Sequence, residues 1–407
     1  MGNQNTGDTY AYLEEIVTGQ TLNYTLDGTS KLQYSKPSDP KTSYLTWETI
    51  ATWNIGLDMS FLNNRLTFTG DYFIRNTEGM LADSYELPGV FGAKTPDENC
   101  ADLRTNGWEL YLGWNDSFAL MGKRFNYTVS ATLGDNKTVF TKFNNPEKNL
   151  SNHYEGKVLG EIWGYRVDGL FVSDEEAAEY TSKINQDAVN ERILTDKVDP
   201  YYRAGDLKFR DLDGDNVISK GDDTAYDAGD REIIGNETPR YMYSFRLGAD
   251  WNGFDLGIFF QGVGKRDWYP NYLSTGFWGP YSRAFTSFIP ENFMDQCWSE
   301  ENRDGYFPRF RGYQTFAGSQ LGVNNDRYLQ DASYIRLKNL TVGYTLPVLK
   351  KVFTKLRVYF TGENLWYWSP MLKHTKYIDP EAAGGNGNTG MAYNYSRNFS
   401  VGVDITF

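Results

Sequence analysis

The acidic stretch DLDGDNVISKGD, residues 211–222, has the residue types and the spacing of a twelve-residue calcium-binding loop. If Asp211 is the first position, carboxylates fall at the first, third, fifth and twelfth positions, where a hard cation takes oxygen ligands. A backbone carbonyl and a hydroxyl or water would complete the shell. The predicted ligands are Asp211, Asp213, Asp215, Val217, Ser219 and Asp222.

Three departures from the usual loop weaken this prediction. Asn216 replaces the glycine of the sixth position, although asparagine is the next residue most tolerant of a positive φ. Asp222 is shorter than the usual glutamate, and no clear helices flank the loop. The alternative is an acidic turn that binds no metal.

Aromatic residues crowd the predicted long loops and form a second candidate site. Flat aromatic side chains stack on sugar rings or on peptide side chains, whereas the alternative is that they pack the loops together or form an interfacial belt. The predicted substrate-binding residues are Trp268, Trp278, Trp298, Trp366 and Trp368.

The sequence contains no recognisable catalytic set. His153 and His374 are the only histidines, neither has metal-ligand spacing, and the GxSxG and HExxH patterns are absent. We therefore expect no enzyme. The net charge of −13 also argues against nucleic acid as a partner, because phosphates would be repelled.

The elements that must position these residues are strands with two unlike faces. In the closing segment NFSVGVDITF, residues 398–407, every second residue is apolar and those between are polar or small. Similar alternation recurs in pairs and predicts roughly ten strands. The clearest segments are 55–61, 66–74, 108–114, 125–133, 241–251, 254–260, 340–346, 356–360 and 392–407.

The connections between these strands alternate in length. Short turns are expected at 63–65, 116–124, 252–253 and 347–354, and long loops at 83–104, 140–239, 265–333 and 366–391. Outer-membrane barrels sort their connections in this way, with short periplasmic turns and long extracellular loops. The sequence therefore predicts an all-β, antiparallel transmembrane β-barrel. Polar residues between the apolar ones would face its lumen, namely Asn54, Asp58, Asp71 and Arg75.

Composition bounds the organisation of the chain. No run of 18 apolar residues exists, which excludes transmembrane helices, and no signal peptide is present. We expect residues 1–43 to be an extracellular segment and residues 44–407 to be the C-terminal part of a larger barrel whose plug domain is absent. Of the two cysteines, Cys100 and Cys297, a disulfide is possible, but two buried thiols are favoured.

Several sequence blocks resemble the SusC/RagA family of TonB-linked outer-membrane proteins from Bacteroidetes. They follow one another in family order over nearly all 407 residues and include LTWETIATWNIGLDMSFLNNRLTFTGDYFIRNTEGML, GEIWGYRVDGLF, GDLKFRDLDGDNVISKGDD and YIRLKNLTVGYTLP.

The resemblance implies a barrel of roughly 22 strands, to which this chain contributes the C-terminal strands. It also implies a bacterial outer-membrane location, a SusD-like surface lipoprotein as partner, contact with TonB through a missing N-terminal region, and import of oligosaccharides or peptides. The alternative function is a secreted, calcium-stabilised β-protein that binds carbohydrate through loop aromatics. That alternative requires the apolar faces of its strands to meet in a core.

Overall fold

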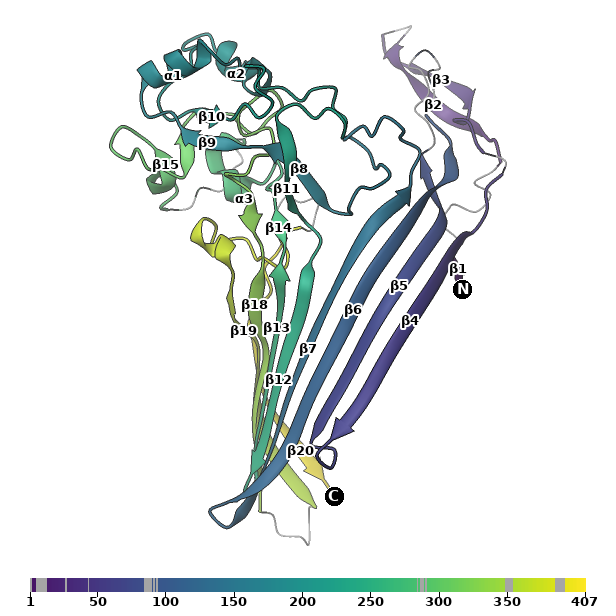
Figure 1. Cartoon of the computed structure of the whole chain (residues 1–407), viewed down its shortest axis with the longest axis vertical. Helices are drawn as coiled ribbons and strands as arrows, with labels where there is room; N and C mark the ends of the chain where they lie inside the picture. Colours follow the sequence, from purple (N-terminus) through teal and green to yellow (C-terminus); the bar gives the residue numbers. More distant parts are fainter. Residues whose placement is uncertain are drawn as a thin grey trace.

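A computed structural model describes residues 2–4, 13–25, 28–42, 44–83, 90, 92, 94–283, 285, 289, 291–347, 354–384 and 392–407. Its main element is one ten-stranded antiparallel sheet in which each strand pairs with the next in sequence, apart from small strands in the loops (Figure 1). The strands are β1 (Gly2–Gln4), β4 (Glu48–Phe61), β5 (Leu66–Asp83), β6 (Asp97–Leu120), β7 (Lys123–Lys142), β12 (Arg240–Trp251), β13 (Phe254–Lys265), β18 (Tyr334–Leu346), β19 (Lys355–Trp368) and β20 (Asn398–Thr406).

This sheet confirms the predicted all-β fold of barrel type. Nine of its strands correspond to the nine alternating segments. The tenth, β1, is a three-residue edge strand within residues 1–43, which we expected to be an extracellular segment. Within the described residues β1 and β20 do not pair with each other, so the sheet is open.

The short turns lie at one end of the strands and the long loops at the other (Figure 1). The turn expected at 116–124 is much tighter than predicted, because β6 and β7 pair as far as Leu120 and Lys123. The strands β6 and β7 also continue above the predicted segments, over 24 and 20 residues. A membrane-spanning strand needs about 10 residues, so both strands extend well beyond a bilayer.

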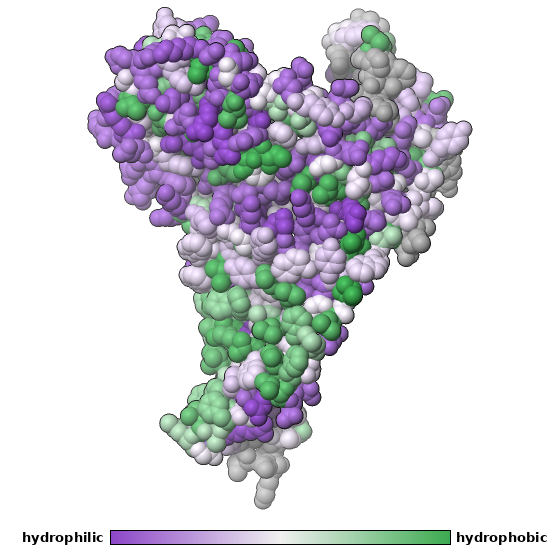
Figure 2. Space-filling model, in the orientation of Figure 1, coloured by the Kyte–Doolittle hydropathy of each residue, from purple (hydrophilic) through white to green (hydrophobic). Residues whose placement is uncertain are grey.

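The apolar face of the sheet has no second protein layer against it in the described residues. Leu57, Leu112, Phe245 and Val403 remain 53%, 49%, 43% and 55% exposed. Hydrophobic residues gather towards the short-turn end of the molecule, and hydrophilic residues cover the long-loop end (Figure 2). This exposed apolar face fits lipid as its neighbour. It contradicts the alternative of a secreted protein with a core between two apolar faces.

Three long loops, which follow β7, β13 and β19, pack together into a separate folded cap. Their residues share one hydrophobic core, to which the first loop contributes Phe209, the second Trp278 and Phe307, and the third Ile378. The cap contains the paired strands β8 (Glu161–Tyr165) with β11 (Arg231–Asn236), β9 (Val167–Leu170) with β10 (Leu207–Phe209), β14 (Asp267–Trp268) with β17 (Gln330–Asp331), and β15 (Cys297–Trp298) with β16 (Phe307–Arg309).

The helices of the cap are short. They are α1 (Asp174–Thr181), α2 (Glu191–Leu194) and α3 (Thr275–Trp278), with 3-10 turns at Asp187–Val189, Gly279–Tyr281, Met294–Gln296 and Pro370–Lys373. A separate hairpin, β2 (Ile16–Thr25) with β3 (Lys31–Pro37), follows β1. No helix among the described residues is both long and apolar enough to cross a bilayer. Both cysteines are buried, as favoured from the sequence.

Candidate functional site

The polar face of the sheet carries a continuous row of hydrogen-bonding side chains across eight strands. Strand register places the row members directly beside one another from β4 to β19. They are Asp58, Thr69, Tyr111, Thr132, Ser244, Gln261, Arg336 and Tyr367. Neighbouring members bond to each other: the Thr69 hydroxyl donates to Asp58 at 2.7 Å, and the Thr132 and Ser244 hydroxyls lie 2.7 Å apart.

The four predicted lumen-facing residues all lie on this polar face. Asp58 is opposite Thr69, Asp71 is opposite Gly56, and Asn54 and Arg75 alternate with the exposed apolar residues of their strands. The ion pairing between the aspartates and Arg75 that the sequence suggested is not found among the described residues. Instead, the Arg75 guanidinium lies 6.0 Å from the ring of Phe73.

Small hollows lie along the polar face of the sheet, which we call the polar wall. One, of about 330 Å³, is lined by Asp71, Glu109, Tyr111 and Thr132 among others. A second, of about 400 Å³, continues across β12 and β13 and is lined by Thr132, Ser244 and Gln261 among others. Thr132 borders both, so the hollows adjoin. Hydroxyl, amide and carboxylate groups here can exchange hydrogen bonds with a polar solute.

The third long loop is tied to the upper end of the polar wall by buried ion pairs. Arg336 of β18 bonds to Asp379 of the loop, and each side chain is only 1% exposed. Glu381 lies 3.1 Å from the Arg336 Nε and accepts two hydrogen bonds of 2.8 Å from Lys338. The rings of two tyrosines flank the Arg336 guanidinium. These contacts hold residues 379–381 against the inner face of the sheet.

Three of the five predicted substrate-binding tryptophans are buried in the cap, which contradicts their assignment. Trp268 and Trp278 are about 1% and 0% exposed, and Trp298 is 6% exposed beneath the Arg309 guanidinium. Because long loops need a core of their own, these rings pack against other side chains rather than against a ligand. Trp278 lies 5.3 Å from the ring of Tyr328, and its Nε1 donates to the carbonyls of the preceding loop.

The remaining two, Trp366 and Trp368, are exposed but lie on the apolar face. Register pairs Trp366 with Leu337 and Trp368 with Ile335, in the same rows as the exposed Phe245 and Leu57. This is the face that fits lipid, so both rings point away from the polar face of the sheet. Their outward position, rather than burial, contradicts the prediction that they bind substrate.

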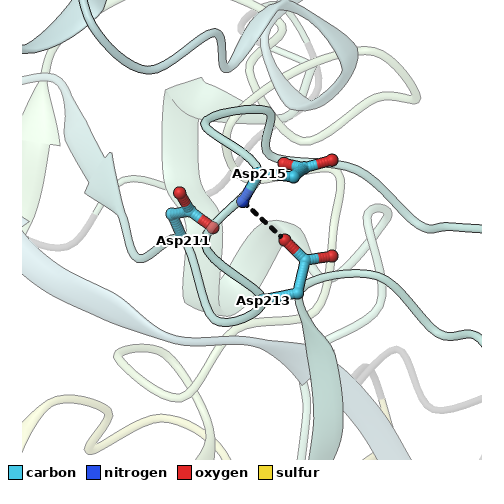
Figure 3. Close-up of side chains that lie close together, drawn as sticks. All are labelled: Asp211, Asp213 and Asp215. Carbon is cyan, nitrogen blue, oxygen red and sulfur yellow. Dashed lines mark hydrogen bonds between the residues drawn. The ribbon is translucent and has the colours of Figure 1, made fainter.

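The acidic loop brings three of its predicted ligands together. Carboxylate oxygens of Asp211, Asp213 and Asp215 all lie within 4.8 Å of one another (Figure 3). Asn216 has the positive φ, 66°, that the sixth position requires. Backbone N–H groups of the loop donate to the carboxylates: Asn216 N–H to Asp211 at 3.0 Å and Asp215 N–H to Asp213 at 3.1 Å.

Asp222 does not belong to the cluster of Asp211, Asp213 and Asp215. Asp230, which the sequence analysis missed, is bonded to the backbone of the loop. Its fully buried carboxylate accepts hydrogen bonds from the N–H groups of Leu212, at 2.7 Å, and Ser219, at 2.8 Å. Burial raises the pKa of Asp230, and repulsion from the nearby Asp213 and Asp211 raises it further. Asp230 lies eight residues beyond Asp222, outside the twelve-residue calcium-loop pattern, so that pattern could not identify it.

The polar wall, the lipid-compatible face and the one-sided loops together define an outer-membrane β-barrel wall. Comparison with known proteins agrees. No family model matches the chain. It is 28% identical over 392 residues to TonB-dependent receptor P3 of Formosa agariphila, covering 89% of this chain and 34% of that protein. It is 24% identical over 428 residues to TonB-dependent receptor SusC of Bacteroides thetaiotaomicron, covering 100% and 36%.

A solved structure, the RagAB peptide transporter, has the same fold, with a TM-score of 0.66 at 22% identity over 98% of this chain and 39% of that one. The chain thus spans about a third of the length of the curated relatives named above. These relatives confirm the resemblance to the SusC/RagA family that the sequence blocks predicted, and the bacterial outer membrane as the location. They are named as receptors and transporters, not as enzymes.

Proposed function

We propose that this chain forms part of the barrel wall of a SusC-like, TonB-dependent importer of oligosaccharides or peptides. The observation that carries the proposal is the two-faced sheet, in which one face presents apolar side chains outward and the other a polar row across eight strands. Such a wall separates lipid from a wet passage. Names given to the relatives, TonB-dependent receptor and peptide transporter, support import as its role.

The mechanism involves no covalent chemistry. Sugar hydroxyls and peptide amides both donate and accept hydrogen bonds, so a cargo of either class can exchange partners along the row that contains Thr132, Ser244 and Gln261. Each bond is weak, and passage requires that binding sites be numerous and individually weak. The polar wall supplies this arrangement, while the charged groups Asp58 and Asp71 keep it hydrated.

The partners we propose act at opposite ends of the barrel. A SusD-like surface lipoprotein would cover the end that carries the folded cap, and TonB would act through residues outside this chain. Solved structures of a similar protein, the RagAB peptide importer, are described as "open-open" and "closed-closed" states. In this chain the cap would be the surface that the lipoprotein contacts.

Uptake by the intact protein in living cells tests the import function. Thr132→Trp with Ser244→Trp places two large rings over the 400 Å³ hollow. The matched control is Val129→Trp with Leu247→Trp, a directly paired position on the same two strands but on the outward face. We expect the inward pair to slow uptake of fluorescent oligosaccharide and peptide pools, and the outward pair to leave it unchanged. Equal uptake in both variants and in a strain lacking the protein would refute import.

We also propose that the loop formed by residues 211–222 binds calcium. Three converging carboxylates, a positive φ at Asn216 and the buried Asp230 behind them support a site for a hard cation. A bound cation would offset the mutual repulsion of these groups. Asp211, Asp213 and Asp215 would supply carboxylate oxygens and Val217 its carbonyl, with Ser219 acting directly or through water.

Thermal unfolding of the intact protein with and without calcium tests this site. A ligand at 100 times its dissociation constant stabilises the folded state by about 2.7 kcal/mol, so a rise in the unfolding temperature of the cap is expected. Asp213→Ala should abolish the rise, whereas Asp222→Ala, outside the cluster, should retain it. An equal response in both variants would remove the calcium proposal.

A further inference from the structure

Aromatic residues on the outward face mark where the membrane ends on the long-loop side. Tyr72 and Trp108 are paired in register, and Tyr243 and Trp368 occupy the next row towards the short turns. Trp53 contacts the Tyr72 ring edge-on at 6.4 Å. Aromatic rings of this kind concentrate at the level of the lipid headgroups. The outward residues beyond them are therefore at headgroup height.

Two exposed cations lie on the same outward face, Lys137 in the register row of Trp53 and Arg104 one row nearer the long loops. Lys137 of β7 is paired with Asn106, one row above the pair of Trp108 and Asp135, and Arg104 of β6 lies one row higher. Two residues advance about 6.6 Å along a strand, or about 5 Å of depth at a tilt of about 40°. Lys137 thus stands about 5 Å, and Arg104 about 10 Å, above the row of Tyr72 and Trp108, which matches the headgroup layer.

Neither cation forms an ion pair with a carboxylate of the described residues. Asp135, the closest carboxylate in register, is occupied by Arg240 through two hydrogen bonds of 2.5 Å. Glu78 and Asp102 lie on the loop side of Arg104, and the Asp102 carboxylate accepts the Gly79 N–H at 2.8 Å. Diagonal neighbours on a sheet face are about 7–8 Å apart, so one anionic group can lie between Arg104 and Lys137.

We propose that Arg104 and Lys137, with the Asn106 amide, bind the phosphate of an anionic lipid in the outer leaflet. A lipid seated there would place its acyl chains over the apolar rows below and its phosphate between the two cations. The proposal rests on the outer-membrane location and not on import, so it stands or fails independently of the proposed function. A second copy of the chain, docked through this face, is the rival occupant.

Native mass spectrometry of the intact, detergent-purified protein tests the proposal. Phosphatidylglycerol and phosphatidylcholine with identical acyl chains are offered separately, and the retained lipid is counted. Each basic residue near a membrane surface contributes about 1 kcal/mol towards anionic lipid, so Arg104→Gln with Lys137→Gln should reduce the preference for phosphatidylglycerol about 30-fold. The matched control, Lys31→Gln with Lys36→Gln, removes the same charge from the exposed strand β3 and should keep the preference.

The lipid preferences of the wild type and the two variants decide whether Arg104 and Lys137 form the lipid site. Loss of the preference in the Arg104 and Lys137 variant alone, together with weakening of the wild-type preference in high salt, supports the lipid site. The proposal is overturned if the wild type shows no preference, or if both variants lose it equally. It is also overturned if the Arg104 and Lys137 variant changes the oligomeric state measured in the same spectra, since that result identifies a second copy as the occupant.

Discussion

Replacement of Leu112 by arginine should destabilise the intact protein far more than replacement of its neighbour Tyr111. The two side chains leave adjacent positions on β6 in opposite directions. Leu112 shares a row with Phe68, Ala131 and Phe245 on the apolar face, whereas Tyr111 borders the polar hollow of about 330 Å³. The two substitutions share a strand and nearly the same depth. A difference in stability between them therefore reports only the face of the sheet on which each side chain lies.

The magnitude follows from the depth of Leu112. It lies four residues from Trp108 in the aromatic belt, which is about 13 Å along the strand and about 10 Å of depth. An arginine near the bilayer midplane of a barrel costs about 2–4 kcal/mol, or roughly 30- to 700-fold in the ratio of folded to unfolded protein. Tyr111→Arg exposes its guanidinium to water in the lumen, so its cost should remain below about 1 kcal/mol.

Urea titration of the protein in phospholipid vesicles, followed by tryptophan fluorescence, measures this difference. The free energy of unfolding of the two variants should depend on urea concentration with similar slopes. The urea concentration at the unfolding midpoint should be much lower for Leu112→Arg than for Tyr111→Arg. Equal midpoints, or the reverse order, would show that the apolar face contacts protein rather than lipid. The assignment of inner and outer faces would then be refuted.

Three further outcomes concern the cap. Trp278→Ala should lower the free energy of unfolding of the cap by about 3–5 kcal/mol, whereas Trp368→Ala should change it little, as near-ultraviolet circular dichroism during thermal unfolding can establish. Asp379→Leu should cost about 3 kcal/mol or more in the same assay because it leaves Arg336 without its buried partner, and adding Arg336→Met should recover much of the loss. Burial, helped by neighbouring cations, lowers the pKa of His374 from 6.5 to about 4. The unfolded chain therefore binds the proton first, and stability should decline as the pH falls from about 6.5 to about 4; His374→Phe should remove this component, and an unchanged pH profile in that variant would contradict the assignment.

The sheet could be predicted from the sequence because its signals are local. Alternation with a period of two specifies which side chains share a face, and short turns such as Asn252-Gly253 specify antiparallel neighbours. These signals correctly placed Asn54, Asp58 and Asp71 on the polar face. The turn at 116–124 was predicted to be too long, because Phe118 and Leu120 continue the alternation of β6 and pair with Phe125 and Lys123.

The cap could not be predicted in the same way, because its contacts join segments far apart in the chain. Phe209, Trp278 and Ile378 belong to three different loops and meet in one core. No spacing within a single loop reveals that Trp278 is enclosed. Likewise, the buried ion pair of Arg336 and Asp379 joins a strand to a loop 43 residues further on.

The amino-acid sequence by itself determined the two-faced strands, the one-sided distribution of loops and the three clustered carboxylates from Asp211 to Asp215, because each depends on residues within one or two turns of backbone. Only the tertiary structure decided that Trp278 is a core residue, that Trp368 faces outward, and that the buried Asp230 accepts hydrogen bonds from the backbone of the acidic loop. Burial and register arise from packing between distant segments, and this packing has no periodic signature in the chain.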